Sequence, residues 1–268
     1  MAGRNAGQAD VILEGAADDE AFASVAGAGD LNKDGFSDVV VGASAYKTPG
    51  GTEICNNFID DNSNLRIDRQ DPDCHLGRAY VFLGGASLPQ RISAADGSVK
   101  RIERPAGGDG FAFSVASAGD VNDDGFADLL VGAFLSDIQV GSTTVEDAGR
   151  AYLYFGGSTF DPNPDVTFLG EAAFVSDTPL SGQFGFAVSG AGKLNNDNLE
   201  DIIIGGYLHD TGILATQSDV GRVYIFFGRS SFSATIQAGD ACQTTSEQCI
   251  TGSVAAPGPD NGFGVSVQ

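Results

Sequence analysis

The chain has 268 residues, of which 42% are hydrophobic and 38 are glycine, so it can bury a sizeable core and is rich in turns. Its 36 acidic residues outnumber the 14 lysines and arginines, and the net charge of −22 argues against nucleic acid or an anionic membrane surface as partner. No apolar run approaches the roughly 18 residues of a membrane span, and so acidic a chain is costly to fold unless cations neutralise part of its charge.

Three kinds of block recur along the chain. The first reads SVAGAGDLNKDGFSDVVVGA in its first copy, and its copies are residues 24–43, 114–133 and 187–206, with a fourth beginning at 263–268. The second is Gly-Arg followed by an apolar run, at residues 77–85, 149–157 and 221–229. The third is a weaker apolar stretch, at residues 11–13, 99–102, 166–169 and 250–254.

Each repeat contains four strand candidates, which is the number in a β-propeller blade. In the second repeat, strands A to D are expected at residues 114–118, 128–133, 151–155 and 166–169. Strand B is apolar throughout, as expected of a strand buried on both faces. The sequence therefore predicts an all-β fold of four-stranded antiparallel propeller blades in one domain over residues 1–268. The blades are expected at approximately 21–103, 111–170 and 184–254, and the start of a further blade at 263–268.

About three blades with partial flanking strands make an incomplete propeller, because propellers typically have about four to eight blades. We expect either that further blades of a longer chain complete the ring or that self-association does.

An acidic loop joins strands A and B in each repeat. Ca²⁺ takes roughly six to eight oxygen ligands, and alternate side chains of a tight loop supply them together with one backbone carbonyl. Gly35 and Gly125 stand at position 6, where the chain must turn with positive φ. We predict calcium in both loops; the alternative is an Asn/Asp-rich turn without metal. The ligands at positions 1, 3, 5, 7 and 9 are Asp30, Asn32, Asp34, Phe36 (carbonyl) and Asp38 in the first loop, and Asp120, Asn122, Asp124, Phe126 (carbonyl) and Asp128 in the second.

The third copy departs from this pattern because Lys193 stands at position 1. A lysine removes one ligand and adds a positive charge, so this loop is predicted to be a weak or absent metal site. Our hypothesis is that the ammonium group replaces the cation and pairs with Asp197 and Asp201. The other equivalent positions are held by Asn195, Leu199 and, at position 6, Asn198, the side chain that best tolerates positive φ after glycine.

These repeated elements resemble the FG-GAP repeat of the integrin α-subunit propeller and its bacterial relatives. The resemblance rests on Phe111-Ala-Phe-Ser-Val, on the following Gly-Asp and on Val-Gly-Ala. The corresponding elements recur in order three times over nearly the whole chain, with Lys193 in place of the aspartate and Gly206 in place of the alanine in the third copy. It departs from the family at Ala21-Phe22 and Phe111-Ala112, where Phe-Gly is usual. It implies a propeller fold, calcium in the A–B loops, and ligand recognition on the opposite face.

A fourth acidic loop, residues 55–74, is flanked by cysteines. Its oxygens have EF-hand-like spacing, although Leu65 stands where glycine is usual. The stretch CNNFIDDNSNLRIDRQDPDC also resembles a Cys-flanked, Asp-rich calcium motif of secreted bacterial proteins, with Arg69 in place of the inner cysteine. The resemblance implies a third calcium site and a Cys55–Cys74 disulfide; a solvated acidic loop is the alternative. The candidate ligands are Asp60, Asn62, Asn64, Arg66 (carbonyl), Asp68 and Asp71.

The four cysteines form two local pairs, Cys55 with Cys74 and Cys242 with Cys249. An even number in local pairs indicates two disulfides and an oxidising compartment, with four free thiols as the alternative. We therefore expect an extracellular or cell-surface protein, although no signal peptide is recognisable in these residues.

The insertions between strands B and C are long and irregular: residues 45–76, 134–148 and 207–220. Because strands alternate in direction, they are expected at the end of the sheets opposite the acidic loops. Long loops on a rigid scaffold often carry binding sites; insertions without a partner are the alternative.

An arginine precedes strand C in every repeat, as Arg78, Arg150 and Arg222. Because a catalytic residue would not be expected once per blade, we interpret these arginines as structural, paired with a neighbouring acidic loop.

The sequence favours a calcium-binding module for adhesion or for recognition of a protein or glycan. The alternatives are the propeller domain of a secreted polysaccharide-degrading enzyme and a structural component of a surface fibre. No catalytic constellation is recognisable, because the sequence has no nucleophile elbow and no H-E-x-x-H motif, and its only histidines are His75 and His209. We expect no catalytic activity, no nucleic-acid partner and no insertion into a membrane.

Overall fold

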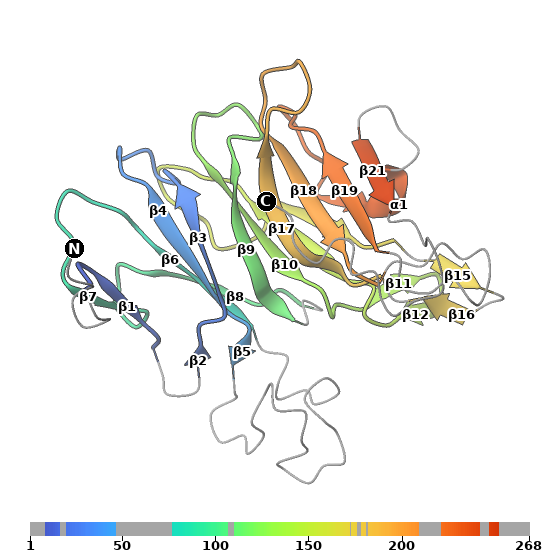
Figure 1. Cartoon of the computed structure of the whole chain (residues 1–268), viewed down its shortest axis with the longest axis horizontal. Coiled ribbons are helices and arrows are strands. Elements are labelled where there is room, and N and C mark those ends of the chain that lie inside the picture. The colour runs from blue at the N-terminus through green and yellow to red at the C-terminus, as the bar shows by residue number, and fades with distance from the viewer. Residues whose placement is uncertain are drawn as a thin grey trace, which may run out of the picture.

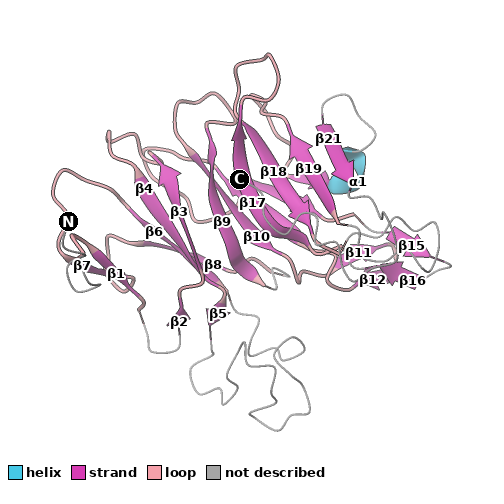
Figure 2. Ribbon diagram, in the orientation of Figure 1, coloured by secondary structure: helices cyan, strands magenta, loops and turns pink. Residues whose placement is uncertain are grey.

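The computed structural model describes residues 9–16, 20–46, 77–106, 110–171, 173–175, 178–180, 182–208, 221–241 and 247–251. Within these ranges the fold is almost entirely β, and its helical content is the four-residue α1 (Ala238–Ala241), as Figure 2 shows. No helix in the described part of the chain is long and apolar enough to cross a membrane.

Three four-stranded antiparallel meanders form the body of the described part of the chain (Figure 1). Sheet 1 consists of β3 (Ser24–Gly29), β4 (Asp38–Ala43), β6 (Arg78–Phe82) and β8 (Lys100–Glu103). Sheet 2 consists of β9 (Phe111–Gly119), β10 (Asp128–Ala133), β13 (Arg150–Tyr154) and β14 (Val166–Leu169). Sheet 3 consists of β17 (Phe184–Gly192), β18 (Asp201–Gly206), β19 (Arg222–Phe226) and β21 (Glu247–Thr251). The predicted fold of propeller blades with four antiparallel strands is therefore confirmed.

Two connections add short parallel strands, which the sequence did not predict. β20 (Thr235–Gln237) lies between the third and fourth strands of sheet 3, yet it pairs in parallel with β14 of sheet 2. In the same way, β7 (Arg91–Ser93) lies within sheet 1 in the sequence and pairs in parallel with β1 (Ile12–Glu14). Each of these strands therefore links its own sheet, through backbone pairing, to an outer strand that comes earlier in the chain.

Three small antiparallel pairs complete the described strands. They are β2 (Glu20–Ala21) with β5 (Ala45–Tyr46), β11 (Ile138–Val140) with β12 (Thr143–Val145), and β15 (Ala173–Val175) with β16 (Thr178–Leu180). In Figure 1 all three lie at the lower end of the sheets.

The core lies between neighbouring sheets. One buried cluster joins sheets 1 and 2 through residues such as Val40, Phe111 and Leu129, and another joins sheets 2 and 3. The second strand of each sheet is almost completely buried, as predicted from its unbroken apolar run.

Glycine in the Val-Gly-Ala segment allows the sheets to approach closely. A Cβ atom on Gly42 would lie 2.0 Å from the carbonyl oxygen of Ala112 in sheet 2, and one on Gly132 would lie 2.0 Å from the carbonyl oxygen of Gly185 in sheet 3. Neighbouring sheets therefore pack backbone against backbone at these glycines.

Candidate metal centre

The three acidic loops join the first and second strands of the three sheets. They are named here the first Asp loop (residues 30–38), the second Asp loop (120–128) and the third loop (193–201). All three lie at the same end of the sheets, the upper end in Figure 1. This is the end opposite β11 and β12, so the 134–148 insertion lies where the alternation of strands predicts.

The first Asp loop is a turn organised by its own side chains. The Asp30 carboxylate accepts hydrogen bonds from the backbone N–H groups of Asp34, at 3.1 Å, and Gly35, at 2.9 Å. Asn32 Oδ1 accepts from the Asp34 N–H at 3.0 Å, and Asp34 Oδ1 accepts from the Phe36 N–H at 2.9 Å. Short polar side chains close such turns readily, because they bond to backbone N–H groups a few residues further on.

The second Asp loop repeats this network bond for bond. Asp120 accepts from the N–H groups of Asp124 and Gly125, at 3.1 and 2.9 Å, and Asp124 accepts from the Phe126 N–H at 2.9 Å. Gly35 and Gly125 have φ values of 90° and 84°, which confirms the positive φ predicted at position 6. Lys33 and Asp123 at position 4 also have positive φ, 60° and 62°, which was not predicted.

The aspartate at position 9 differs from the others because it is buried. Asp38, Asp128 and Asp201 are at most 1% exposed. In the second Asp loop, Oδ2 of Asp128 accepts from the Val121 N–H and Oδ1 from the Gly156 N–H, both at 2.9 Å. Asp38 and Asp201 make the equivalent pairs of bonds in their sheets. This residue therefore clamps each loop to the end of the third strand of its own sheet.

The glycine that receives this clamp was not identified from the sequence as a functional position. A Cβ atom on Gly84, Gly156 or Gly228 would lie within 2.4 Å of a loop carbonyl oxygen. The sequence does contain a pattern that indicates this clamp. A glycine recurs at this place in every Gly-Arg block, and an aspartate recurs at position 9 even in the third loop.

Burial of a carboxylate beside two others opposes its ionisation. The pKa of Asp128 is raised to about 7, chiefly by desolvation and also by the charges of Asp124 and Asp120, against the lowering effect of the bonds from Gly156 and Val121. The pKa of Asp38 is raised by the same causes. A divalent cation among these carboxylates would favour their ionised forms, since an opposite charge stabilises a carboxylate.

The donor chemistry of both Asp loops fits a hard cation. Each loop offers carboxylate oxygens, one amide oxygen and one backbone carbonyl, the ligand types that Ca²⁺ prefers. A carboxylate oxygen that accepts one N–H retains a second lone pair for a metal. Within the described ranges, no three His, Cys, Asp or Glu side chains are close enough to hold an ion by themselves. Calcium would therefore also require the Asn oxygen, the Phe carbonyl and a closer approach of the carboxylates.

The third loop keeps part of the network. Asn195 and Asp197 accept from the N–H groups of Asp197 and Leu199, both at 2.9 Å, and Asn198 has the predicted positive φ, at 70°. The expected pairing of Lys193 is not present, because none of the ion pairs found among the described residues joins Lys193 to Asp197 or Asp201.

Two other predicted features lie outside the described residues. These are the acidic loop of Asp60, Asn62, Asn64, Arg66, Asp68 and Asp71, and the cysteine pairs, of which only Cys249 falls on a described strand, β21.

Neighbouring Asp loops are joined by backbone hydrogen bonds. The Ala127 N–H of the second loop donates to the Asp30 carbonyl of the first at 3.1 Å, and the Glu200 N–H of the third loop donates to the Asp120 carbonyl of the second at 3.4 Å. The row of loops is thus continuous from sheet 1 to sheet 3.

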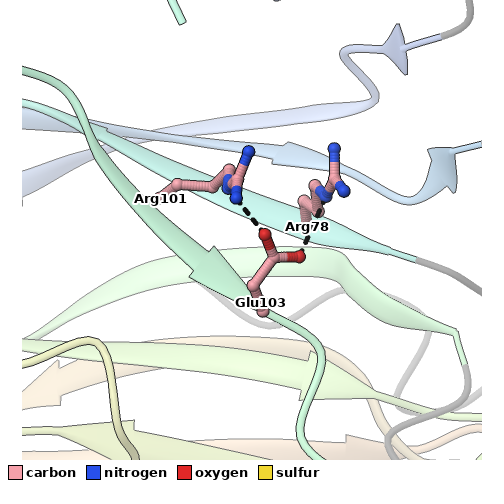
Figure 3. A network of polar contacts seen from close by, with 3 residues as sticks. All are labelled: Arg78, Arg101 and Glu103. Carbon is pink, nitrogen blue, oxygen red and sulfur yellow. Dashed lines mark hydrogen bonds and ion pairs between the residues drawn. The ribbon is translucent and has the colours of Figure 1, made fainter. Parts of the chain in front are cut away.

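The repeated arginines bind acceptors at strand ends and in the adjoining connections, which agrees with a structural role. Arg78 pairs with Glu103 of β8 at 3.0 Å, and Arg101 pairs with the other oxygen of Glu103 at 2.6 Å (Figure 3). Arg222 in sheet 3 pairs with Glu171, which follows β14 of sheet 2. Arg150 donates to the carbonyl oxygens of Ala106 and Asp137, at 3.3 and 2.7 Å.

A cluster of aromatic rings lies at the other end of sheets 2 and 3. Phe113 lies 4.7 Å from Phe134 and 5.0 Å from Phe186, and Phe186 lies 5.1 Å from Tyr207, measured between ring centroids. Phe134 and Tyr207 directly follow the second strands of their sheets, so the cluster lies where the 134–148 and 207–220 insertions begin. Phe113 is 38% exposed, so part of this aromatic cluster is accessible to solvent.

The FG-GAP repeat family matches residues 22–53 and 108–154. The phosphatidylinositol-glycan-specific phospholipase D of Bos taurus is 30% identical over 212 residues, which are 76% of this chain and 20% of that protein. Integrin alpha-5 of Xenopus laevis is 32% identical over 119 residues (44% and 10%), and integrin alpha-PS2 of Drosophila melanogaster is 26% identical over 218 residues (80% and 13%). The chain thus spans a fifth or less of these relatives. Both matched segments contain an Asp loop between two strands, and the chain therefore carries FG-GAP repeats like those of an integrin α propeller.

Proposed function

We propose that this chain is a calcium-stabilised propeller module that acts outside the cell or at its surface. We further propose that it recognises a protein or glycan through the loops at the end opposite the Asp loops. The observation that carries the calcium role is the identical network of the two Asp loops, in which N–H groups orient the carboxylates in the same way in two different sheets.

Charge balance supports calcium as the ion. The chain has 22 more acidic than basic residues, and the buried Asp38 and Asp128 of the two Asp loops have raised pKa values in the absence of a cation. Bound divalent cations would neutralise part of this charge at the place where carboxylates are concentrated. Because they bind only the folded loops, they would stabilise the fold.

The recognition role is supported by the opposite end of the sheets. The partly exposed cluster of Phe113, Phe134, Phe186 and Tyr207 offers an apolar aromatic surface beside two long insertions. Aromatic side chains are enriched in binding surfaces because they bury a large area at little cost in conformational entropy. The resemblance to integrin propellers points to recognition at the same end.

Thermal unfolding tests the calcium role. Saturation of two sites at about 100 times their Kd should raise Tm by roughly 10 °C relative to the chelated protein. The double variant Asp34→Ala/Asp124→Ala should lose this rise, whereas Asp197→Ala, in the third loop, should keep it. Equal melting with calcium and with chelator would refute the calcium role.

Binding to arrays of glycans and extracellular proteins tests recognition. Ligands captured by the wild type should be lost by Phe113→Ala and retained by Phe36→Ala, which truncates another exposed phenylalanine at the Asp-loop end. Retention by both variants would exclude the aromatic cluster as the recognition surface. Turnover of a polysaccharide on the same array would favour the enzymatic alternative.

A further inference from the structure

We propose that Lys33 is a built-in counter-cation of the second Asp loop, which lowers the calcium affinity of that loop and makes the two sites unequal. This inference rests on the proposed calcium role of the loops. It concerns a residue that belongs to one loop and acts on the next.

The Lys33 side chain leaves its own loop and lies on its neighbour. Its Nζ atom is 5.3 Å from the centroid of the Phe126 ring, and a Cβ atom on Gly125 would lie only 2.4 Å from Nζ. Gly125 occupies position 6 of the second Asp loop, and Phe126 offers the carbonyl at position 7. The ammonium group is thus placed beside the turn that would surround the ion.

Three features hold Lys33 in this position. It has a φ of 60°, a left-handed conformation that is uncommon for a residue with a long side chain. The hydrogen bond from the Ala127 N–H to the Asp30 carbonyl brings the two loops together directly beside it. The face of the Phe126 ring adds a cation–π interaction, worth about 0.5–1 kcal/mol at exposed sites.

The charge acts on the two states of the second loop in opposite directions. Without an ion, the ammonium group partly offsets the mutual repulsion of the carboxylates of Asp120, Asp124 and Asp128. With Ca²⁺ bound, the same ammonium group repels the ion. Both effects lower the affinity of the second site. Because Lys33 is exposed, salt screens them in part.

The arrangement is not a general property of the repeats. In the second loop the equivalent position is held by Asp123, which has nearly the same φ of 62° but the opposite charge. The loop that precedes the third loop thus carries an acidic residue at position 4, whereas the loop that precedes the second loop carries a basic one. Lys33 thus makes the second Asp loop electrostatically different from the first, although their own ligands are identical.

Calorimetric titration with CaCl₂ of the whole chain tests this inference. The two sites are distinguished by the background variants Asp34→Asn and Asp124→Asn, which weaken the first and the second site while keeping an acceptor for the N–H group of position 7. Lys33→Met should raise the affinity of the second site about five-fold at low salt, and Lys33→Glu should raise it more. Lys33→Arg should leave it unchanged, as should Lys100→Met, which removes a positive charge from strand β8.

The results separate failure of this inference from failure of the calcium role. If both sites bind calcium but Lys33→Met leaves the second affinity unchanged, or raises both affinities equally, Lys33 does not have the proposed role. If the folded wild type binds no calcium at all, the calcium role itself is wrong. Melting temperatures of every variant in chelator show that each one folds.

Discussion

The aspartate at position 9 has a structural role that is separate from its proposed role as a metal ligand. Both of its carboxylate oxygens accept backbone N–H groups in the absence of an ion. Asp128 is completely buried between Val121 and Gly156, so neither N–H group has water as a substitute partner. The clamp explains why an aspartate is present at this position in the third loop, where Lys193 stands in place of the first aspartate. The sequence predicted this residue as a ligand but not as a clamp, since the bond to Gly156 spans 28 residues.

Replacement of Asp128 by asparagine should therefore destabilise the protein even in chelator. The amide supplies one acceptor where two are needed, which leaves a buried N–H unsatisfied at a cost of about 1–3 kcal/mol. Urea unfolding at pH 8 measures this loss. Asp123→Asn, an exposed change in the same loop at a positive φ that asparagine tolerates, should stay within about 0.5 kcal/mol. Equal effects of the two changes would argue against the clamp.

The raised pKa of Asp128 predicts a pH dependence of the metal-free protein. The folded pKa of about 7 lies above the ordinary value of 3.8, so between these two pH values the folded state holds a proton that the unfolded state has lost. The contribution of this group to stability is complete below about pH 4 and is lost as pH rises through 7. In chelator, the Tm should fall between pH 5 and pH 8, and Asp128→Asn should have a smaller slope. A Tm that rises with pH would contradict the assignment.

At the scale of the elements, the close approach of neighbouring sheets depends on glycine in the second strand. Gly42 of β4 lies against the Ala112 carbonyl of β9, and backbone cannot yield as a flexible side chain can. Gly42→Ala should therefore destabilise the protein by about 3 kcal/mol or more, because overpacking forces the backbone to shift. Gly27→Ala in the adjacent β3 meets nothing within 4 Å and should change stability by less than about 0.5 kcal/mol. Chemical denaturation of the two variants compares them directly.

The elements that could be predicted from sequence are those with a local signal. Strands such as β10 and β13 follow from unbroken apolar runs with recurring glycines, and the Asp loops follow from the spacing of oxygen-bearing residues. The parallel strands β7 and β20 could not be predicted, because they are three residues long and their pairing crosses from one repeat to another. The same limit applies to Lys33, whose partner Phe126 lies in a different loop.

At the scale of the whole molecule, the net charge of −22 opposes the compact state through self-repulsion. Salt screens this repulsion, with a Debye length of about 10 Å at 0.1 M and about 3 Å at 1 M. The chelated protein should therefore melt at a higher temperature in 0.5 M NaCl than in 0.02 M NaCl. This increase in Tm should be smaller when calcium is present, because the bound ions neutralise part of the negative charge in the Asp loops. A salt-independent Tm in chelator would indicate that the carboxylates are already compensated within the fold.

The continuous row of backbone bonds through the loops gives the molecule the thermodynamics of a linear array, in which each unit is stabilised chiefly by its nearest neighbours. In such an array, disorder starts at the weakest unit and spreads from there to its neighbours. Sheet 3 is that unit, because its loop lacks the first aspartate and its link to the second loop is the longer of the two, at 3.4 Å. Amide protons of β18 should consequently exchange with solvent before those of β10. An ion held in the second loop would stabilise sheet 2, so that disorder of sheet 3 would not spread to it.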